Sequence, residues 1–292
     1  MLRRININRI ATVSMFLLLV GVLLIPIFIG LGLWQRAMPI LDKYPIEQLL
    51  FGTEWMPMQG QFGFFAFIIS SIVVTIISAL VAVPLCLLSA IYLTQYASKR
   101  LLNIMNLSID ILAGIPSVVY GVWGILVIVP FVSYLASLWG IQTAGYSLLS
   151  GGLILAIMTI PYSLNLLLEV FQQIPIELTE VSLSLGANRW QTIKHVLIRR
   201  GFSGILSAFS LGISKAFGET MAVLMVVGNV VNVPQTVFDS GYPLPALIAN
   251  HYGEMMSIPL YDSALMLTAL LLFIVIFAFN FFAHYLIYKS EV

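Results

Sequence analysis

Six apolar segments, each long enough to cross a lipid bilayer, constrain this chain more than any other feature. They cover about residues 10–34, 65–94, 101–132, 148–171, 202–228 and 262–288. A membrane-spanning helix needs about 20 apolar residues, because each residue advances about 1.5 Å across a hydrocarbon core of about 30 Å. We expect helices, since backbone polar groups in lipid must bond within their own segment and no segment alternates like a barrel strand. The sequence therefore predicts an all-α, polytopic membrane protein with six transmembrane helices.

The composition excludes a soluble protein. Only 9% of the residues are charged and 60% are hydrophobic, whereas about 25% of the residues of a soluble domain are charged. The single cysteine, Cys86, excludes an internal disulfide, and His195, His251 and His284 lie far apart in the sequence. No metal-ligand spacing such as HExxH or CxxC is present. We therefore expect this chain to bind no metal or other cofactor, and we expect no nucleic-acid partner.

The positions of the basic residues predict the orientation in the membrane. If the six segments cross in turn, ten of the 13 Lys and Arg residues fall on the side of the N-terminus: Arg3, Arg4, Arg9, Lys99, Arg100, Arg189, Lys194, Arg199, Arg200 and Lys289. The outer loops hold Arg36 and Lys43, and Lys215 lies within a segment. Because cytoplasmic loops carry an excess of basic residues, we expect both termini in the cytoplasm.

The inner loop at about 172–201 has the pattern of a helix, a sharp turn and a second helix. Pro175 can open a helix, and Glu177 and Glu180 follow where negative charge suits the helix dipole. Gly186 permits the turn, after which apolar residues recur at helical spacing from Trp190 onward. By its pattern alone, this loop could be an interfacial helix whose basic residues meet lipid headgroups, with Trp190 as an aromatic anchor.

Three motifs carry a resemblance to a known family. The inner loop resembles the cytoplasmic signature of ABC importer permeases, because Glu180 and Gly186 have its spacing. Val181 and Ser182 replace the two alanines of that signature, and Arg199 replaces its proline. The stretches SLGANRWQTIKHVLIRR, ISKAFGETMAVLMVVGN and LAGIPSVVYGVWG are similar to the permeases of the phosphate-specific transport (Pst) system, and ETMAV resembles the PstC-type subunit. The resemblance covers roughly residues 65–288.

The resemblance implies the architecture of a type I ABC importer permease in the bacterial cytoplasmic (inner) membrane. Residues 1–64 would form an N-terminal transmembrane helix and an outer loop. Residues 65–292 would form a five-helix permease core, with a cytoplasmic coupling loop at about 172–201 that docks on an ATPase. The coupling residues that it implies are Glu180, Gly186, Ala187, Arg189 and Trp190.

The resemblance also implies the partners of this chain. They are a second, PstA-type permease, two cytoplasmic ATPase subunits and an extracytoplasmic phosphate-binding protein. The chain has no GxxxxGK[ST] motif, so ATP and Mg²⁺ would be bound by the partner ATPase and this chain would not be an enzyme. The outer loops, about 35–64 and 229–261, would be either the platform for the binding protein or stiff connectors.

Lys215 and Glu219 stand four residues apart inside the fifth apolar segment. Each charge at the centre of a membrane helix costs roughly 2.5–3.5 kcal/mol on insertion scales, so the pair needs a reason. One interpretation is an i,i+4 ion pair that holds spans together. The other, favoured by the resemblance, is a translocation path in which Lys215 touches the passing anion and Glu219 holds Lys215 in place. Thr220, in the same motif, belongs to this expected path.

The third apolar segment supplies the rest of the expected path. Gly114 and Pro116 interrupt the helix near Asp110, and Ser117 follows. Broken helices in transporters present backbone N–H groups to their substrates, which predicts anion contacts here. Alternatively, Ser117 and Gly121 form a small-xxx-small pair that only lets two helices approach closely.

Other functions compete with a phosphate permease. A permease for another oxyanion, such as sulfate or molybdate, and an ion-coupled transporter without an ATPase both fit the composition. Residues 201–204 read GFSG, which matches the serine motif of rhomboid intramembrane proteases, and His284 could then be the partner of Ser203. That short pattern leaves the inner loop and Lys215 unexplained, so we expect transport rather than proteolysis.

Overall fold

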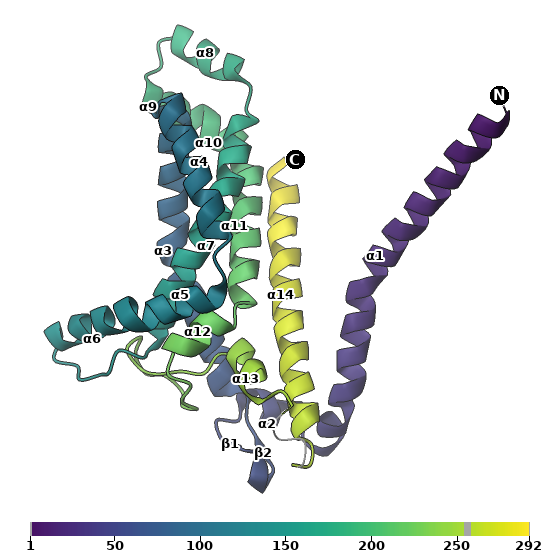
Figure 1. Ribbon diagram of the computed structural model, residues 1–292, viewed down its shortest axis with the longest axis vertical. Coiled ribbons are helices and arrows are strands. Elements are labelled where there is room, and N and C mark those ends of the chain that lie inside the picture. The colour runs from purple at the N-terminus through teal and green to yellow at the C-terminus, as the bar shows by residue number, and fades with distance from the viewer. Residues whose placement is uncertain (1, 254–257, 292) are drawn as a thin grey trace.

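The computed structural model describes residues 2–253 and 258–291, and it is helical almost throughout (Figure 1). Its longer helices are α1 (Leu2–Lys43), α3 (Phe65–Gln95), α4 (Lys99–Ala113), α7 (Leu148–Gln172), α11 (Phe202–Phe217) and α14 (Tyr261–Glu291). Its short helices are α2 (Ile46–Phe51), η1 (Pro57–Gln59), α5 (Ser117–Trp123), α6 (Val129–Leu138), α8 (Ile176–Ser184), α9 (Arg189–Thr192), α10 (Ile198–Arg200), α12 (Met221–Val226) and α13 (Leu244–His251). Two π-helical turns, η2 (Gly124–Ile128) and η3 (Ile193–Leu197), and one hairpin of β1 (Trp55–Met56) with β2 (Gln61–Phe62) complete it.

The central bundle consists of α3, α7 and α11, with α14 against α11. Small residues let these helices approach closely. A Cβ at Gly152 of α7 would collide with Ile77 of α3, and a Cβ at Gly212 of α11 would collide with the hydroxyl of Ser163. Figure 1 shows these helices running side by side along the long axis of the molecule.

The expected spans are confirmed for four of the six segments. Helices with the length and apolar character of a span are Ala11–Lys43, Phe65–Gln95, Ser117–Leu138, Leu148–Gln172 and Tyr261–Lys289. A sixth candidate is a pair of helices, Arg189–Arg200 and Phe202–Phe217, which meet at an angle of 69°. The first, second, fourth and sixth predicted segments therefore correspond to α1, α3, α7 and α14, and the all-α class is confirmed.

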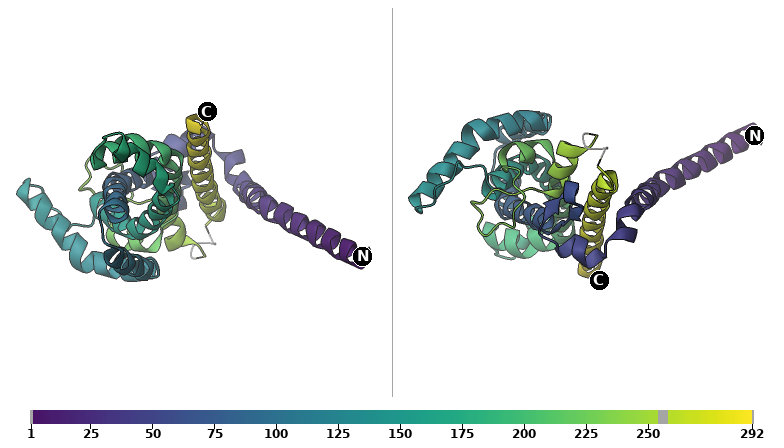
Figure 2. Two further views of the ribbon diagram at one scale, coloured as in Figure 1. Left: turned by 90° about the horizontal axis from the view of Figure 1, so that it is seen from above. Right: turned by 90° about the horizontal axis from the view of Figure 1, so that it is seen from below.

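The bounds predicted for the third span, about 101–132, are wrong, whereas the interruption expected at Gly114 and Pro116 is confirmed. Helix α4 ends at Ala113, and α5 begins only at Ser117. The cause is Pro116, which has no N–H to donate and disfavours helical backbone at the residue before it. The hydroxyl of Tyr120 donates a hydrogen bond of 2.9 Å to the carbonyl of Leu112 and so bridges the break. From Ser117 the helix continues through α6 and turns away from the bundle (Figures 1 and 2).

The prediction of one helix across 202–228 is also wrong. Helix α11 ends at Phe217, and α12 begins at Met221. The amides of Gly218 and Glu219 each donate to a carbonyl three residues earlier, at 3.2 Å, which closes the last turn of α11. Residues 218–220 therefore form a non-helical link, and the charged motif straddles it.

The end of the bundle away from α8, which the sequence predicts to be the outer end, has an apolar core of its own that contains the hairpin (Figure 1). Trp55 of β1 lies edge-on to Phe62 and Phe67, with ring centroids 5.7 and 5.1 Å away. Helix α1 joins this core through Ala37 and Ile40, which are fully buried. The boundary expected after residue 64 coincides with the start of α3 at Phe65, and the division into two parts stays a prediction. Residues 254–257 of the expected outer platform lie outside the described residues.

Helix α1 leaves the bundle as it runs toward the N-terminus (Figure 1). Gly30 of α1 packs against Phe273 of α14. A Cβ at residue 30 would lie 3.3 Å from the Phe273 ring. Before that point the described side chains are nearly all exposed, including Phe16, Leu18 and Phe28. Such a surface requires lipid or another protein around it. The side chains of Arg3 and Arg4, which contribute to the expected orientation, lie outside the described residues.

Candidate functional site

Lys215 lies in the last turn of α11, and its side chain is exposed at the surface of this chain. Its ammonium nitrogen stands 4.7 Å from the centroid of the Tyr162 ring on α7. A cation within about 6 Å of an aromatic face is attracted by the ring, with roughly 0.5–2 kcal/mol of stabilisation. The charge is therefore held by an aromatic ring and remains open to a further, anionic partner.

The expected ion pair between Lys215 and Glu219 does not form. No carboxylate lies within 4 Å of the Lys215 nitrogen in the part of the chain that the structure describes. The spacing of four residues brings side chains together only on a continuous helix, and α11 ends at Phe217. The physical reason for the error is thus the break at Gly218, which carries Glu219 away from the turn that holds Lys215.

Glu219 instead lines a small cavity between α3 and the start of α13. The other lining residues include Ser71, Thr75 and Pro243. Its volume is about 10 Å³, which is room for about one water molecule. The Ser71 hydroxyl is already engaged, because it donates to the Phe67 carbonyl and accepts from the Leu244 amide, each at 2.8 Å. This cavity cannot hold a phosphate ion in the conformation described.

The two motifs LAGIPSVVYGVWG and GETMAVLMVV, about 100 residues apart in the sequence, pack against each other as α5 and α12. A Cβ at Gly121 would lie 2.5 Å from the Met225 sulfur and 3.2 Å from the Ala222 Cα. A Cβ at Gly124 would lie 2.9 Å from Val226. Gly121 therefore allows α5 and α12 to approach closely, as the small-xxx-small interpretation expects. The two motifs pack directly against each other.

The remaining expected path residues lie around the two helix breaks. Asp110, Gly114 and Pro116 are exposed, and Ser117 is half-buried at the first position of α5. Thr220 is half-buried just before α12, and its carbonyl accepts from the Leu224 amide at 2.9 Å. Across the described ranges, no hydrogen bond or ion pair links Asp110 to the Lys215 side chain. Their roles in a path stay predictions.

Replacing Gly121 with alanine is expected to destabilise the protein, whereas the same change at Gly114 is not. The new methyl group at residue 121 would press on Met225 and Ala222, and overpacking of this kind costs about 1–3 kcal/mol. At Gly114 the nearest atom to the new Cβ would be 3.5 Å away, and φ is −84°, so the effect should stay within about 0.5 kcal/mol. The midpoint of thermal unfolding in detergent measures both. Equal midpoints would contradict the close packing of α5 on α12.

The inner loop forms the expected helix, turn and second helix. Helix α8 ends in a Schellman motif, in which the Gly186 amide donates to the Leu183 carbonyl at 3.0 Å and the Ala187 amide to the Ser182 carbonyl at 3.2 Å. Gly186 has a φ of +86°, a left-handed conformation that only glycine adopts at little cost. The turn expected from the sequence at this glycine is therefore confirmed.

Two contacts tie α8 to the helix after the turn. The hydroxyls of Ser182 and Thr192 lie 2.9 Å apart. Helix α9 begins with a capping box, in which the Gln191 amide donates to the Asn188 side chain at 2.9 Å and the Asn188 amide to the Gln191 side chain at 2.8 Å. The two halves of the loop therefore form one braced unit.

The loop lies at one end of the bundle (Figure 1), and several of its apolar side chains are exposed. The exposed fraction is 68% for Ile176, 83% for Leu185 and 55% for Trp190. Among the other expected coupling residues, Glu180 and Arg189 are exposed and Ala187 is half-buried. Helix α8 has no buried residue at all, which is the exposure expected of a docking element, although its partner stays a prediction.

Sequence reasoning missed Tyr162, Asn188 and Gln191. The pattern N-x-x-Q at 188–191 is a readable capping-box signal just before a helical run. Tyr162 carries no such signal, because its relation to Lys215 depends on how α7 faces α11.

The protease alternative is not supported by the geometry. Ser203 lies in the first turn of α11, and His284 is exposed on α14. No hydrogen bond joins the two side chains within residues 2–253 and 258–291. A serine nucleophile needs its base within hydrogen-bond reach, and the expected pairing is therefore absent from this conformation.

Known proteins resemble this chain along most of its length. The family model described as binding-protein-dependent transport system inner membrane component matches residues 82–290. A phosphate transport system permease protein PstC of Xylella fastidiosa is 35% identical over 243 residues, which are 78% of this chain and 74% of the relative. The protein of the same name from Haemophilus influenzae is 33% identical over 281 residues, 90% of this chain and 87% of the relative.

Two further comparisons agree with these. A probable ABC transporter permease protein, YqgH of Bacillus subtilis, is 34% identical over 285 residues, 97% of this chain and 90% of the relative. A chain of the inward-facing MetNI methionine ABC transporter superposes with a TM-score of 0.56 at 18% identity, covering 84% of this chain and 97% of that one. At that identity the likeness concerns the fold alone. The resemblance predicted from the three motifs is confirmed.

Proposed function

Because the chain belongs to the family of binding-protein-dependent transport system inner membrane components, we propose that it is a permease subunit of an ATP-driven phosphate importer. The observation that carries this proposal is the packing of two distant motifs as α5 and α12, together with the exposed cation Lys215 in the last turn of α11, the helix that precedes α12. Both motifs are among those that resemble the PstC-type permeases. The chain is a multi-pass membrane protein.

We propose that four partners complete the transporter: a second, PstA-type permease, two cytoplasmic ATPase subunits and an extracytoplasmic phosphate-binding protein. ATP and Mg²⁺ are bound by the ATPase subunits, in keeping with the lack of a phosphate-binding GxxxxGK[ST] loop in this sequence. The exposed apolar side chains of α8 fit a groove on an ATPase. Both termini lie in the cytoplasm, on the side that holds most of the basic residues.

The structure suggests how movement of the ATPase reaches the path. Helix α8 is bonded to α9 through Ser182 and Thr192, and the chain continues from α9 through α10 into α11. Lys215 lies at the far end of α11 from this loop. A displacement of α8 therefore shifts the helix that carries the cation, and alternating exposure of Lys215 to the two sides of the membrane would follow.

The lysine sets the mode of anion recognition in this proposal. An ammonium group is a compact point charge with three donors, whereas arginine binds two phosphate oxygens through a planar fork. Lys215 would therefore attract an oxyanion without fixing its orientation. Selection of phosphate over other oxyanions would rest chiefly on the external binding protein.

Uptake by the reconstituted transporter tests this function. In proteoliposomes that contain the full complex, the ATPase subunits and ATP are on the inside and the binding protein is on the outside. We expect these vesicles to accumulate radiolabelled phosphate. A tenfold excess of unlabelled sulfate or molybdate should leave the uptake unchanged, whereas unlabelled phosphate should abolish it. Uptake without ATP would contradict the ABC mechanism, and competition by sulfate or molybdate would contradict the choice of substrate.

A further inference from the structure

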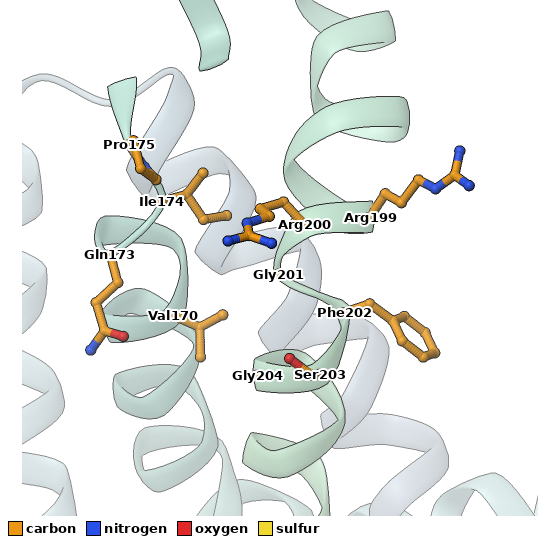
Figure 3. Close-up of a pocket in the computed structure, with 10 residues that line it drawn as sticks. All are labelled: Val170, Gln173, Ile174, Pro175, Arg199, Arg200, Gly201, Phe202, Ser203 and Gly204. Atoms are coloured by element: carbon orange, nitrogen blue, oxygen red, sulfur yellow. The ribbon is translucent and has the colours of Figure 1, made fainter. Parts of the chain in front are cut away.

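An open cleft of about 550 Å³ lies where α7 ends and α11 begins, at the end of the bundle that carries α8. Figure 3 shows its ten lining residues, Val170, Gln173, Ile174, Pro175, Arg199, Arg200, Gly201, Phe202, Ser203 and Gly204. Sites for small molecules have volumes of about 300–1,000 Å³. The proposed path does not use this cleft, because Lys215 lies at the opposite end of α11.

Arg200 supplies a cation inside the cleft. In Figure 3 its guanidinium group extends from the α10 side toward α7, whereas the neighbouring Arg199 points away from the cleft. Neither guanidinium has a carboxylate within 4 Å among the described residues. The Arg200 side chain therefore projects into the cleft without an ion-pair partner among the described residues.

The first turn of α11 lines the same cleft. A bend of 69° at Gly201 separates α11 from the preceding helical segment, so Phe202, Ser203 and Gly204 begin a new helix there. The first backbone N–H groups of a helix have no acceptor within it, and the helix dipole favours an anion at this end. The Ser203 hydroxyl is a further donor at the same turn.

The wall that faces Arg200 is partly apolar (Figure 3). It is formed by Val170 of α7 and by Ile174 just after the end of α7, and Gln173 adds an amide to it. A Cβ at Gly204 would lie 2.7 Å from Val170, so the two helices close the cleft at its base. The cleft therefore combines a guanidinium and the first turn of α11, with the Ser203 hydroxyl, on one side with the hydrocarbon of Val170 and Ile174 on the other.

We propose that this cleft binds a phosphate group, carried either by an anionic phospholipid or by free inorganic phosphate. Arginine matches phosphate because its planar donors bind two oxygens at once. Basic pockets between membrane helices on the cytoplasmic side bind lipid headgroups, and the apolar wall suits the acyl chain of such a lipid. A ligand here joins α7 to α11, the helices on either side of the inner loop.

The test compares Arg200→Gln with the matched control Arg199→Gln in the complete transporter. The two variants lose the same charge at adjacent positions, but only one loses a side chain that enters the cleft. In nanodiscs of phosphatidylcholine with one tenth phosphatidylglycerol, native mass spectrometry counts the phosphatidylglycerol that stays bound. In nanodiscs of phosphatidylcholine alone, without binding protein, equilibrium binding of ³³P-labelled phosphate is measured.

We expect Arg200→Gln to weaken one of the two binding signals about tenfold or more, as loss of a charge-assisted hydrogen bond predicts. Arg199→Gln should change that signal less than twofold. Loss of phosphatidylglycerol identifies a lipid site, and loss of labelled phosphate identifies a site for the free ion. Equal losses in both variants would mean diffuse surface charge, and no loss in either would mean an empty cleft. Both results would overturn the proposal.

Further controls test whether the variants are folded and whether the bound phosphate lies in the cleft or on the transport path. The thermal unfolding midpoint of each variant shows whether it is folded, and Arg200→Lys serves as a second variant that keeps the charge but loses the fork. Lys215→Gln separates the cleft from the transport path, because it removes the cation of the path and leaves Arg200 in place. If Lys215→Gln removes the ³³P signal and Arg200→Gln does not, the phosphate lies on the transport path and the cleft proposal fails, while the proposed function stands.

Discussion

Replacement of Lys215 with glutamine is expected to lower phosphate uptake at least tenfold while leaving insertion and assembly intact. Glutamine keeps a side chain of polar character but removes the positive charge that faces the proposed path. A hydrogen bond to a charged group is worth about 1.5–3 kcal/mol, which corresponds to about one to two powers of ten. Uptake of radiolabelled phosphate by cells that depend on this transporter, with membrane levels checked by immunoblot, measures the loss.

The neighbouring ring and a distant lysine provide the controls for this experiment. Lys99→Gln removes an exposed lysine at the start of α4 and should leave uptake unchanged. Tyr162→Phe keeps the aromatic face beneath the Lys215 ammonium, whereas Tyr162→Leu removes it. We therefore expect uptake by Tyr162→Leu to fall and uptake by Tyr162→Phe to stay near wild type. Normal uptake by Lys215→Gln would assign the lysine a structural role and direct the search for the path to Gly114 and Pro116.

Replacement of Gly186 with proline is expected to uncouple ATP hydrolysis from transport. Gly186 has a φ of +86°, whereas the proline ring fixes φ near −65° and removes the amide that bonds to Leu183. The change would undo the Schellman motif and alter the angle between α8 and α9, because proline cannot adopt the positive φ of this position. The ATPase would still bind and hydrolyse ATP, but its movement would no longer reach α11. We expect phosphate uptake to fall at least tenfold, with ATPase activity retained.

Gly140 offers a control of the same chemistry elsewhere in the chain. It also closes a Schellman motif, with its amide bonded to Ser137 at 3.1 Å and the Ile141 amide bonded to Ala136 at 3.0 Å. Its φ is +74°. As at Gly186, a Cβ added at residue 140 would have no atom within 4 Å among the described residues. Gly140→Pro disturbs a similar turn that lies after α6, away from the inner loop. If both variants lose uptake and ATPase activity together, the effect is on folding and the coupling role is contradicted.

The sequence predicted helices well where one apolar run carries one helix. Phe65–Gln95 and Leu148–Gln172 match the expected ranges to within a residue, because each run ends at a glutamine and begins after a glycine-containing stretch or a capping serine. Ser147, for example, accepts a hydrogen bond from the Ser150 amide at the start of α7. The turn at Gly186 was predictable for a similar reason, since glycine between two apolar patterns indicates a left-handed residue.

The sequence predicted the site less well, because two chemical motifs cross helix breaks. The prediction that Lys215 and Glu219 are neighbours assumed a continuous helix. Gly218, between them, is a residue type that often ends a helix, and it was the sequence signal against that assumption. The partner of Lys215, Tyr162, and the direction of Arg200 depend on the packing of α7 and α11 and on the bend at Gly201. Such relations between helices leave no periodic signal in one sequence.

The outer core also has a consequence for the order in which the protein is made. It unites residues between 37 and 67, which leave the ribosome early, with residues between 242 and 270, which leave it near the end. Contacts across such a long stretch of chain form slowly, because a large loop must close before they are gained. Phe64 and Phe67 have no completed core until Tyr261 and Leu265 have been synthesised. The last helix therefore closes the fold, and an unfinished chain exposes this surface to quality control.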